Sequence, residues 1–195
     1  MLWYWTVGCT NAVGNPFIAE SSFLNGLDES SFERGESIGD WDPVAWLAAR
    51  KALNDGEPDD VLQNSLGLPV FSSRLQQALL AAGIDDVEYL PIHVRRPSGE
   101  EIAGFAIANV LRLVEALDVP RSDVSVFPQD YFLLDRRGRV SAIRRAVLRE
   151  SRLWERDIVR LFEFPSSVYV SERFRDVFVS AGCTGFGFVR VETSS

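Results

Sequence analysis

Three kinds of residue in this chain could support catalysis or metal binding: one histidine, two cysteines and a few closely spaced carboxylates. His93 is the sole histidine, which excludes a His-rich metal centre and leaves one residue for any Ser/His/Asp or Cys/His nucleophilic site. It lies in the alternating apolar stretch from Leu90 to Val94, where a side chain is expected on the face of a sheet. The pattern indicates a structural or exposed histidine.

The two cysteines, Cys9 and Cys183, are too few for a disulfide framework or a four-thiolate metal site. A reducing compartment is the simplest environment for two such thiols. Residues 6–9 are a poor match to a lipoprotein cleavage site, because no basic residue precedes them and the apolar stretch is short. No apolar run approaches the ~20 residues of a membrane helix, so we expect a cytoplasmic protein with no membrane partner.

The best candidates for a catalytic pair of acids are Asp40/Asp42 and Asp59/Asp60. Paired carboxylates can act as general acid and base, but the same residues commonly cap helices and form turns. The glycines of residues 182–187 follow a predicted helix and lead into a strand, the reverse of a phosphate-binding loop. The sequence therefore predicts no enzyme, and no catalytic, cofactor-binding or metal-binding residues. An enzyme built from converged carboxylates and His93 is one alternative.

The elements that would position these residues include a pattern that occurs twice, at residues 71–92 and 170–191. Each copy has a serine suited to cap a helix, Ser72 or Ser171, and a glycine suited to end it eleven residues later. Apolar residues precede and follow each helix as in strands. We therefore expect two similar β-α-β units, at about 68–92 and 167–192, with right-handed crossovers.

The rest of the chain favours short strands between the units. Residues 2–7, 102–108, 124–127, 131–134, 140–148 and 158–162 read as strands, and the arginines of residues 135–139 as a solvated turn. Asp42 and Pro43 predict a helix from Val44 to Leu53, with Asp42 as the N-cap. Strands and helices without regular alternation predict an α+β fold, with a mixed, largely antiparallel sheet and short helices.

The excess of negative over positive charge is confined to the first third of the sequence. The chain has a net charge of −8, and residues 1–66 hold eleven acids against three bases, while acids and bases balance in the remainder. This distribution suits a solvated acidic face or a surface for a basic partner, and it argues against binding nucleic acid through its phosphates. We expect an acidic, aromatic-rich N-terminal region at 1–66 and an α+β domain at 67–195, or one compact domain that includes both.

From Leu66 onward the chain resembles a family of bacterial immunity proteins from polymorphic toxin systems, usually labelled immunity protein eleven. The matching motifs include residues 66–70, 87–91 and 109–118, and the match is stronger at 157–161, 170–174 and 182–188. These motifs cover about two thirds of the chain and identify no active site, whereas residues 1–65 match poorly.

The resemblance implies a small cytoplasmic protein that binds and neutralises a cognate toxin and needs no cofactor. Charge complementarity would then favour a basic toxin, for example a nuclease, against the acidic third. The alternative is a regulatory or oligomeric binding module with no toxin partner. The predicted toxin contacts are acids of the first third, with two tryptophans as aromatic anchors: Asp28, Glu29, Glu33, Glu36, Asp40, Trp41, Asp42, Trp46, Asp55, Asp59 and Asp60.

Overall fold

A six-stranded mixed sheet forms one part of the computed structural model, which describes residues 2–8, 17–42, 44–49 and 56–195. The strand order is β12-β15-β1-β14-β13-β9, and β1 pairs antiparallel with both of its neighbours. The edge strands β12 and β9 are short and pair in parallel. The strands are β1 (Trp3–Gly8), β9 (Leu113–Val114), β12 (Val147–Arg149), β13 (Ile158–Leu161), β14 (Phe164–Ser171) and β15 (Phe186–Ser194).

A second sheet of five strands has the order β3-β4-β7-β8-β6. The long antiparallel hairpin of β7 and β8 is its centre, and β4 adds to β7 in parallel. Two further pairs, β2 with β5 and β10 with β11, stand apart from these sheets. The strands are β2 (Ile18–Ala19), β3 (Ser21–Phe23), β4 (Trp46–Ala48), β5 (Gln63–Asn64), β6 (Val70–Ser72), β7 (Val87–Arg95), β8 (Glu101–Val110), β10 (Asp123–Val126) and β11 (Val140–Arg145).

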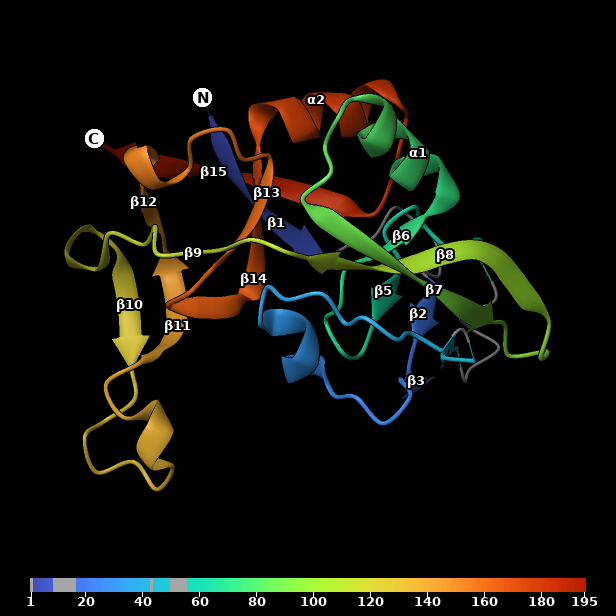
Figure 1. The fold of residues 1–195 in the computed structure, drawn as a ribbon, viewed down its shortest axis with the longest axis horizontal. Coiled ribbons are helices and arrows are strands. Elements are labelled where there is room, and N and C mark those ends of the chain that lie inside the picture. Colours follow the sequence, from blue (N-terminus) through green and yellow to red (C-terminus); the bar gives the residue numbers. More distant parts are fainter. Residues whose placement is uncertain (1, 9–16, 43, 50–55) are drawn as a thin grey trace.

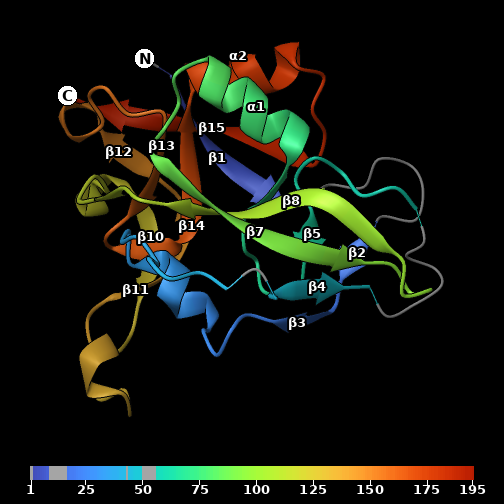
Figure 2. The same ribbon diagram turned by 45° about the vertical axis from the view of Figure 1, so that its right-hand side comes forward.

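Two α-helices lie side by side over one end of both sheets, as Figures 1 and 2 show: α1 (Ser73–Ala81) and α2 (Glu172–Ser180). The hydroxyl oxygens of Ser72 and Ser171 accept hydrogen bonds from backbone amides of the first helical turns, at 3.3 and 3.1 Å. These serines are the N-caps that the sequence predicts. The described residues are mostly strand with two α-helices, an α+β or mainly-β fold.

The strands on either side of each helix are not neighbours in their sheet. Strand β8 lies between β6 and β7 and runs antiparallel to both, and β1 lies in the same way between β14 and β15. A simple β-α-β unit would place its two strands next to each other, so the predicted units differ from the observed order by one inserted strand. The inserted strand lies outside the unit in the sequence: β8 follows β7 in the chain, and β1 precedes β14.

The two halves meet in a shared hydrophobic core beneath the helices. Leu75 and Leu79 of α1 and Phe174 and Phe178 of α2 are all buried there. The ring of Phe186 lies within 5.7–6.4 Å of the rings of Phe71, Phe174 and Phe178, so aromatic contacts join the halves. Two further buried clusters lie within the five-stranded sheet and beneath the six-stranded one.

The predicted helix from Val44 to Leu53 is wrong over its described part. Residues 46–48 form β4, because Ala45, Leu47 and Ala49 alternate with half-exposed residues and Leu47 pairs with Val94 of β7. Asp42 still accepts a hydrogen bond from the amide of Val44 at 3.2 Å, so the capping chemistry is present without a helix. Residues 50–53 lie outside the described residues.

The predicted strand at residues 131–134 is also wrong. Residues 132–134 are exposed, and the segment leads into a 3-10 helix, η4 (Leu134–Arg136), instead of pairing with a strand. Other 3-10 helices are η1 (Glu29–Glu33), η3 (Val119–Arg121) and η5 (Glu150–Arg152). The strands predicted at 2–7, 102–108, 124–127 and 158–162 are confirmed within two residues at each end. No helix in the described part of the chain is long and apolar enough to cross a membrane.

Candidate functional site

The acidic segment, residues 28–42, runs along the edge of the fold and begins with η1. Asp28 caps this 3-10 helix by accepting hydrogen bonds from the hydroxyl of Ser30 at 2.7 Å and the amide of Ser31 at 3.1 Å. These hydrogen bonds, Ser30 first, lower the pKa of Asp28. The segment holds six acids and one base. Five of the acids are exposed and Glu33 is half-buried.

Hydrogen bonds from the sheet hold the acidic segment in place. Glu88 of β7 accepts from the hydroxyl of Ser37 at 2.5 Å, the amide of Ile38 at 2.9 Å and the side-chain amide of Asn109 at 2.9 Å. The same Asn109 amide donates to the backbone oxygen of Glu36 at 2.8 Å. Burial raises the pKa of Glu88, but these hydrogen bonds outweigh it, so the pKa lies below its ordinary value. The carboxylates of the segment are therefore presented by a fixed backbone.

The two predicted aromatic anchors, Trp41 and Trp46, both have partners within the chain. Trp41 packs edge-on against the buried Phe32 and donates from its indole nitrogen to the backbone oxygen of Pro91 at 2.7 Å. Trp46 lies on β4, and the guanidinium carbon of Arg95 stands 5.4 Å from the centre of its ring. Each ring is half-buried, so each leaves part of its surface to solvent.

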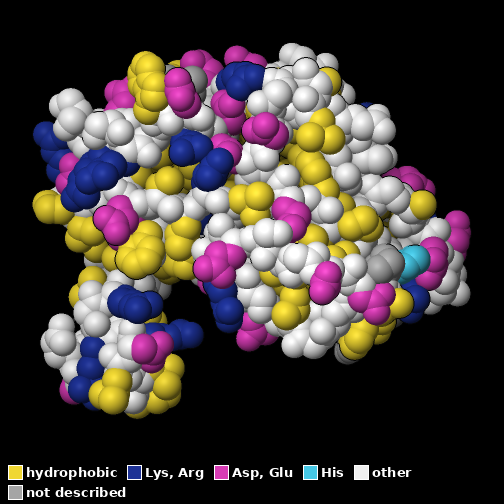
Figure 3. Space-filling model, viewed as in Figure 1, with side chains coloured by type: hydrophobic (Ala, Val, Ile, Leu, Met, Phe, Trp, Pro, Cys, Tyr) yellow, Lys and Arg dark blue, Asp and Glu magenta, His cyan; other side chains and the backbone are white. Residues whose placement is uncertain are grey.

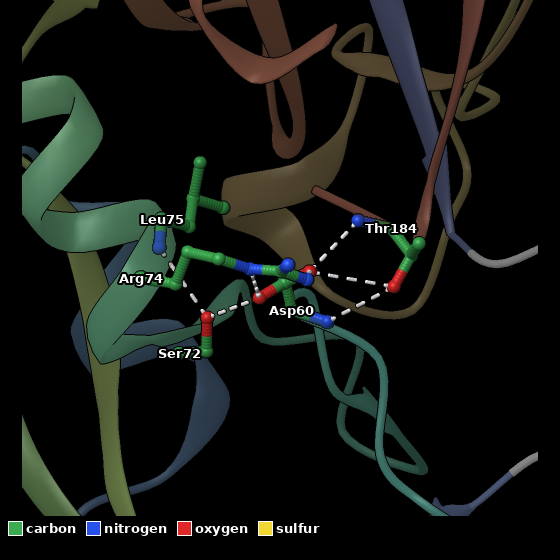
Figure 4. Close-up of polar contacts among 5 residues, drawn as sticks. All are labelled: Asp60, Ser72, Arg74, Leu75 and Thr184. Carbon is green, nitrogen blue, oxygen red and sulfur yellow. Dashed lines mark hydrogen bonds and ion pairs between the residues drawn. The ribbon is translucent and has the colours of Figure 1, made fainter. Parts of the chain in front are cut away.

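Asp60 does not lie on the surface, although it belongs to the predicted contact set. It is only 6% exposed, and it accepts hydrogen bonds from Ser72, Arg74 and Thr184 (Figure 4). Burial raises the pKa of Asp60, but the Arg74, Ser72 and Thr184 contacts outweigh it and lower the pKa. This burial removes Asp60 from the contact set. Asp59 beside it is half-buried, and Asp55 lies outside the described residues.

A groove of about 580 Å³ lies between η1 and the β10–β11 pair. Figure 3 shows it as a notch between the protruding part of the molecule and the body, with hydrophobic side chains gathered beside it. Phe162 and Val126 are more than half exposed there. The groove is lined by Ser30, Glu33, Arg34, Glu36, Leu113, Val119, Val126, Gly138, Arg139, Val140, Phe162, Glu163 and Pro165.

Five charged residues of the groove form no ion pair within the described part of the chain: Glu33, Arg34, Glu36, Arg139 and Glu163. In contrast, Arg74, Arg95, Arg96, Arg112, Arg144, Arg145, Arg156, Arg173 and Arg175 all pair with carboxylates. Unpaired charges beside an apolar floor are available to a partner.

Two polar groups behind the groove are incompletely satisfied. Arg160 is 1% exposed, donates from Nη1 to the backbone oxygen of Pro165 at 2.6 Å, and has no partner for Nε. Burial lowers the pKa of Arg160 to about 10, against a smaller opposite effect of Glu33. Burial also raises the pKa of Glu163, whose Oε2 is buried without a hydrogen bond. Sequence reasoning placed none of these residues in a site.

The arm, residues 127–139, links β10 to β11 and forms one wall of the groove. The amide of Phe127 donates to the oxygen of Arg139 at 2.9 Å, and the amide of Gly138 donates to the oxygen of Phe127 at 3.0 Å. The rings of Phe127, Tyr131 and Phe132 follow one another at centroid distances of 4.6 Å. The tip is apolar and exposed, with Phe132 at 76% and Leu134 at 73%.

His93 lies on the β7–β8 hairpin and lines, with Glu101, an open hollow of about 480 Å³. It is 46% exposed, and its Nδ1 is 3.1 Å from Glu101, which also accepts a hydrogen bond from Arg95 at 3.1 Å. The Arg95 hydrogen bond is the main cause of a lowered pKa at Glu101, which makes this carboxyl a poor proton donor. Nowhere among the described residues do three or more His, Cys, Asp or Glu side chains form a group suited to a metal ion.

This face of the molecule combines a fixed acidic segment, a groove and a protruding apolar arm. The chain belongs to the Immunity protein family (Imm11), which matches residues 24–193 of its 195 residues. No curated protein matches the chain. The family match begins well upstream of Leu66, where the recognisable motifs begin, and so includes the whole acidic segment.

Proposed function

We propose that this chain neutralises a cognate bacterial toxin in the cytoplasm by direct binding, with the acidic segment facing a basic surface of the toxin. The observation that carries the proposal is the set of exposed carboxylates on a backbone held by Glu88 and Asn109, within a member of the immunity family. A fixed backbone reduces the entropy lost on binding. Opposite charges on the two surfaces raise the association rate and exclude other partners.

A nuclease is the toxin class that fits this surface best. A nuclease must bind phosphates, so its substrate groove is positively charged. Carboxylates such as Glu29, Glu36 and Asp40 are exposed, and within the described part of the chain their side chains form no hydrogen bond or ion pair that would hold them back from such a groove. An immunity protein that occupies the groove blocks substrate access without any chemistry of its own. The proposed contacts are Asp28, Glu29, Glu33, Glu36, Asp40, Asp42 and Asp59, with Trp41 and Trp46 at their edges.

Co-expression with the product of the adjacent gene tests this function. We expect that product to stop bacterial growth when expressed alone, and the chain to restore growth and to co-purify with it. The purified product should degrade plasmid DNA or total RNA, and an equimolar amount of the chain should abolish that activity. Neutralisation by binding would be contradicted if growth were restored but the two proteins did not co-purify, or if growth were restored in cells where the chain had been degraded.

Charge reversal tests the contact surface separately. The double variant Glu29→Lys/Asp40→Lys changes two exposed carboxylates that hold no element in place, so the fold should survive. We expect a weaker complex, mainly through slower association, and a smaller loss of affinity on adding salt. The matched control is Asp85→Lys/Asp176→Lys, which makes the same charge change near α1 and α2. Equal effects of the two variants would show that only net charge matters and that the acidic segment is not the contact.

A further inference from the structure

Large exposed hydrophobic residues concentrate around the groove and the arm. Val119, Val126 and Phe162 line the groove, at 37%, 52% and 58% exposure. Phe132, Leu133 and Leu134 form the tip of the arm, at 76%, 38% and 73%. Monomeric soluble proteins rarely expose so many apolar groups in one place unless a partner covers them. The apolar surface therefore points to an occupant for both the groove and the arm.

The arm is built to keep its shape when it is exposed. Backbone hydrogen bonds between Phe127 and the residues at its other end close its base, and Arg137 Nε donates to the backbone oxygen of Tyr131 at 2.8 Å across the loop. The guanidinium carbon of Arg136 lies 5.9 Å from the centre of the Phe127 ring. A loop that is already ordered loses little conformational entropy when its tip becomes buried.

The arm and the groove are complementary in both polarity and charge. The arm tip combines apolar side chains with the exposed cations Arg136 and Arg137, which form no ion pair among the described residues. The groove combines an apolar floor with Glu33 and Glu36, which likewise lack ion-pair partners there. Arg34 and Arg139 also line the groove, so the complementary pairs are Glu33 and Glu36 of the groove with Arg136 and Arg137 of the arm.

We propose that the occupant is a second copy of this chain, with the arm of each copy seated in the groove of the other. The arm forms one wall of its own groove through Gly138 and Arg139, next to Val126 at the end of β10. Arm and groove are therefore side by side on one face, which is the layout that a two-fold symmetric exchange requires. Each arm then lies between the arm and the η1 helix of the other copy, and both apolar surfaces leave solvent together.

Sedimentation equilibrium of the purified full chain, from about 1 to 100 µM, tests the dimer without any toxin. We expect the mass to rise from that of the 21.8 kDa monomer to twice that value. The variant Phe132→Ser/Leu134→Ser alters only side chains that are more than 70% exposed, and it should raise the dissociation constant at least about 100-fold. The control Leu80→Ser/Val179→Ser removes exposed apolar groups from α1 and α2. Its dissociation constant should equal that of the wild type.

A mixing experiment tests the pairing of arm with groove. Variant one, Glu33→Lys/Glu36→Lys, reverses the groove, and variant two, Arg136→Glu/Arg137→Glu, reverses the arm. Each alone should be mainly monomeric at concentrations where the wild type dimerises. Mixed together they should form a heterodimer, because both of its arm–groove contacts again join opposite charges. If variant one loses its thermal unfolding transition, Glu36→Lys alone takes its place, since Glu36 is exposed whereas Glu33 is half-buried.

Three results would overturn the proposal. The first is a wild-type chain that stays monomeric at the highest concentration. The second is a dimer that the α1–α2 control weakens as much as the arm variant does. The third is a monomeric chain whose arm variant loses affinity for the adjacent gene product, which would make the toxin the occupant. The first two results leave neutralisation untested, and the third supports toxin binding, so the dimer can fail while the proposed function stands. Glu33 and Glu36 belong both to the groove and to the proposed toxin contacts, so the second copy and the toxin compete for these two carboxylates.

Discussion

Asp60 and Asp157 occupy equivalent places in the two halves of the fold. Each accepts a hydrogen bond from the hydroxyl of the serine that caps the following helix, Ser72 for α1 and Ser171 for α2. The backbone amides of these serines also donate to the backbone oxygens of the same aspartates, at 2.7 and 2.9 Å. The similarity of residues 71–92 and 170–191 therefore extends upstream to an aspartate that neither copy includes.

An arginine completes each of these arrangements. Arg74 pairs with Asp60, and Arg173 pairs with Asp157 at 2.5 Å, so serine, arginine and aspartate fix the first turn of each helix. The two sites reach the other half of the fold in different ways, and at the second site Arg173 does so by donating to the backbone oxygen of Ala82. Asp60 also accepts a hydrogen bond from the amide of Thr184 at 2.9 Å, which joins the first half of the chain to the second. Asp60 thus fixes the first turn of α1 and also joins the two halves through Thr184 (Figure 4).

Replacing Asp60 should destabilise the protein more than replacing Asp157. Asp60→Ala removes charge-assisted hydrogen bonds from Ser72, Arg74 and Thr184 at a buried position, which should lower the free energy of unfolding by about 3 kcal/mol. Asp157→Ala removes the contacts to one half only and should cost less. Urea unfolding of both variants measures the difference. Equal losses would show that the Thr184 contact adds nothing.

Acid should weaken the protein through Asp60. The pKa of Asp60 is lower in the folded chain than its ordinary value of 3.8, because hydrogen bonds outweigh the opposing effect of burial. Its contribution is fully present above pH 3.8 and is lost as the pH falls through the folded pKa. We expect the free energy of unfolding to drop below about pH 4, and Asp60→Asn to show a shallower drop. The pKa of Glu88 is also lowered in the folded chain. Protonation of Glu88 should therefore still lower the free energy of unfolding of Asp60→Asn in acid.

The sequence predicts the two helices well because their signals are local. Ser72 and Ser171 begin them, Gly83 and Gly182 follow them at positive φ, and all four residues act within one or two turns. At residues 44–49, in contrast, contacts with residues distant in the sequence override the local signal. Its Asp-Pro start predicts a helix, but pairing with β7 and the burial of Ala45 and Leu47 decide the outcome.

The candidate site depends on contacts that no local pattern reveals. The groove combines residues near 33, 113, 126, 139 and 162, which only the folded chain brings together. Asp60 looks like a surface acid in the sequence, yet its partner Thr184 lies 124 residues away. The exposed apolar tip of the arm reads as a strand, because hydrophobic residues in an extended stretch normally indicate burial. The acidic character of residues 28–42 is the part of the site that composition alone predicts.

Arg160 should be replaceable by an apolar residue with a gain in stability. The side chain is 1% exposed, its Nε has no partner, and among the described residues it forms no ion pair. Burying such a charge costs more than its single side-chain hydrogen bond to Pro165 returns. We expect Arg160→Met, which has similar volume, to raise the free energy of unfolding by about 1 kcal/mol and Tm by about 2–4 °C. Arg160→Ala, which leaves a cavity, is the matched control and should destabilise. A loss of stability in Arg160→Met would instead assign the buried guanidinium a structural partner.

Gly185 should tolerate substitution far less well than Gly182, although both have positive φ, at +103° and +62°. A Cβ atom at Gly185 would lie 2.5 Å from the backbone oxygen of Val61 and 2.9 Å from its nitrogen, whereas one at Gly182 would meet nothing within 4 Å. Gly182→Ala therefore carries only the left-handed penalty of about 1 kcal/mol. Gly185→Ala adds a backbone clash, and we expect a total of about 3 kcal/mol in urea unfolding. The clash pushes residues 59–61 away from Thr184. In Gly185→Ala protein, Asp60→Ala should therefore lose most of the additional free energy of unfolding that it costs relative to Asp157→Ala. Additive effects of the two substitutions would show that the close approach at Gly185 and the Asp60 contact act independently.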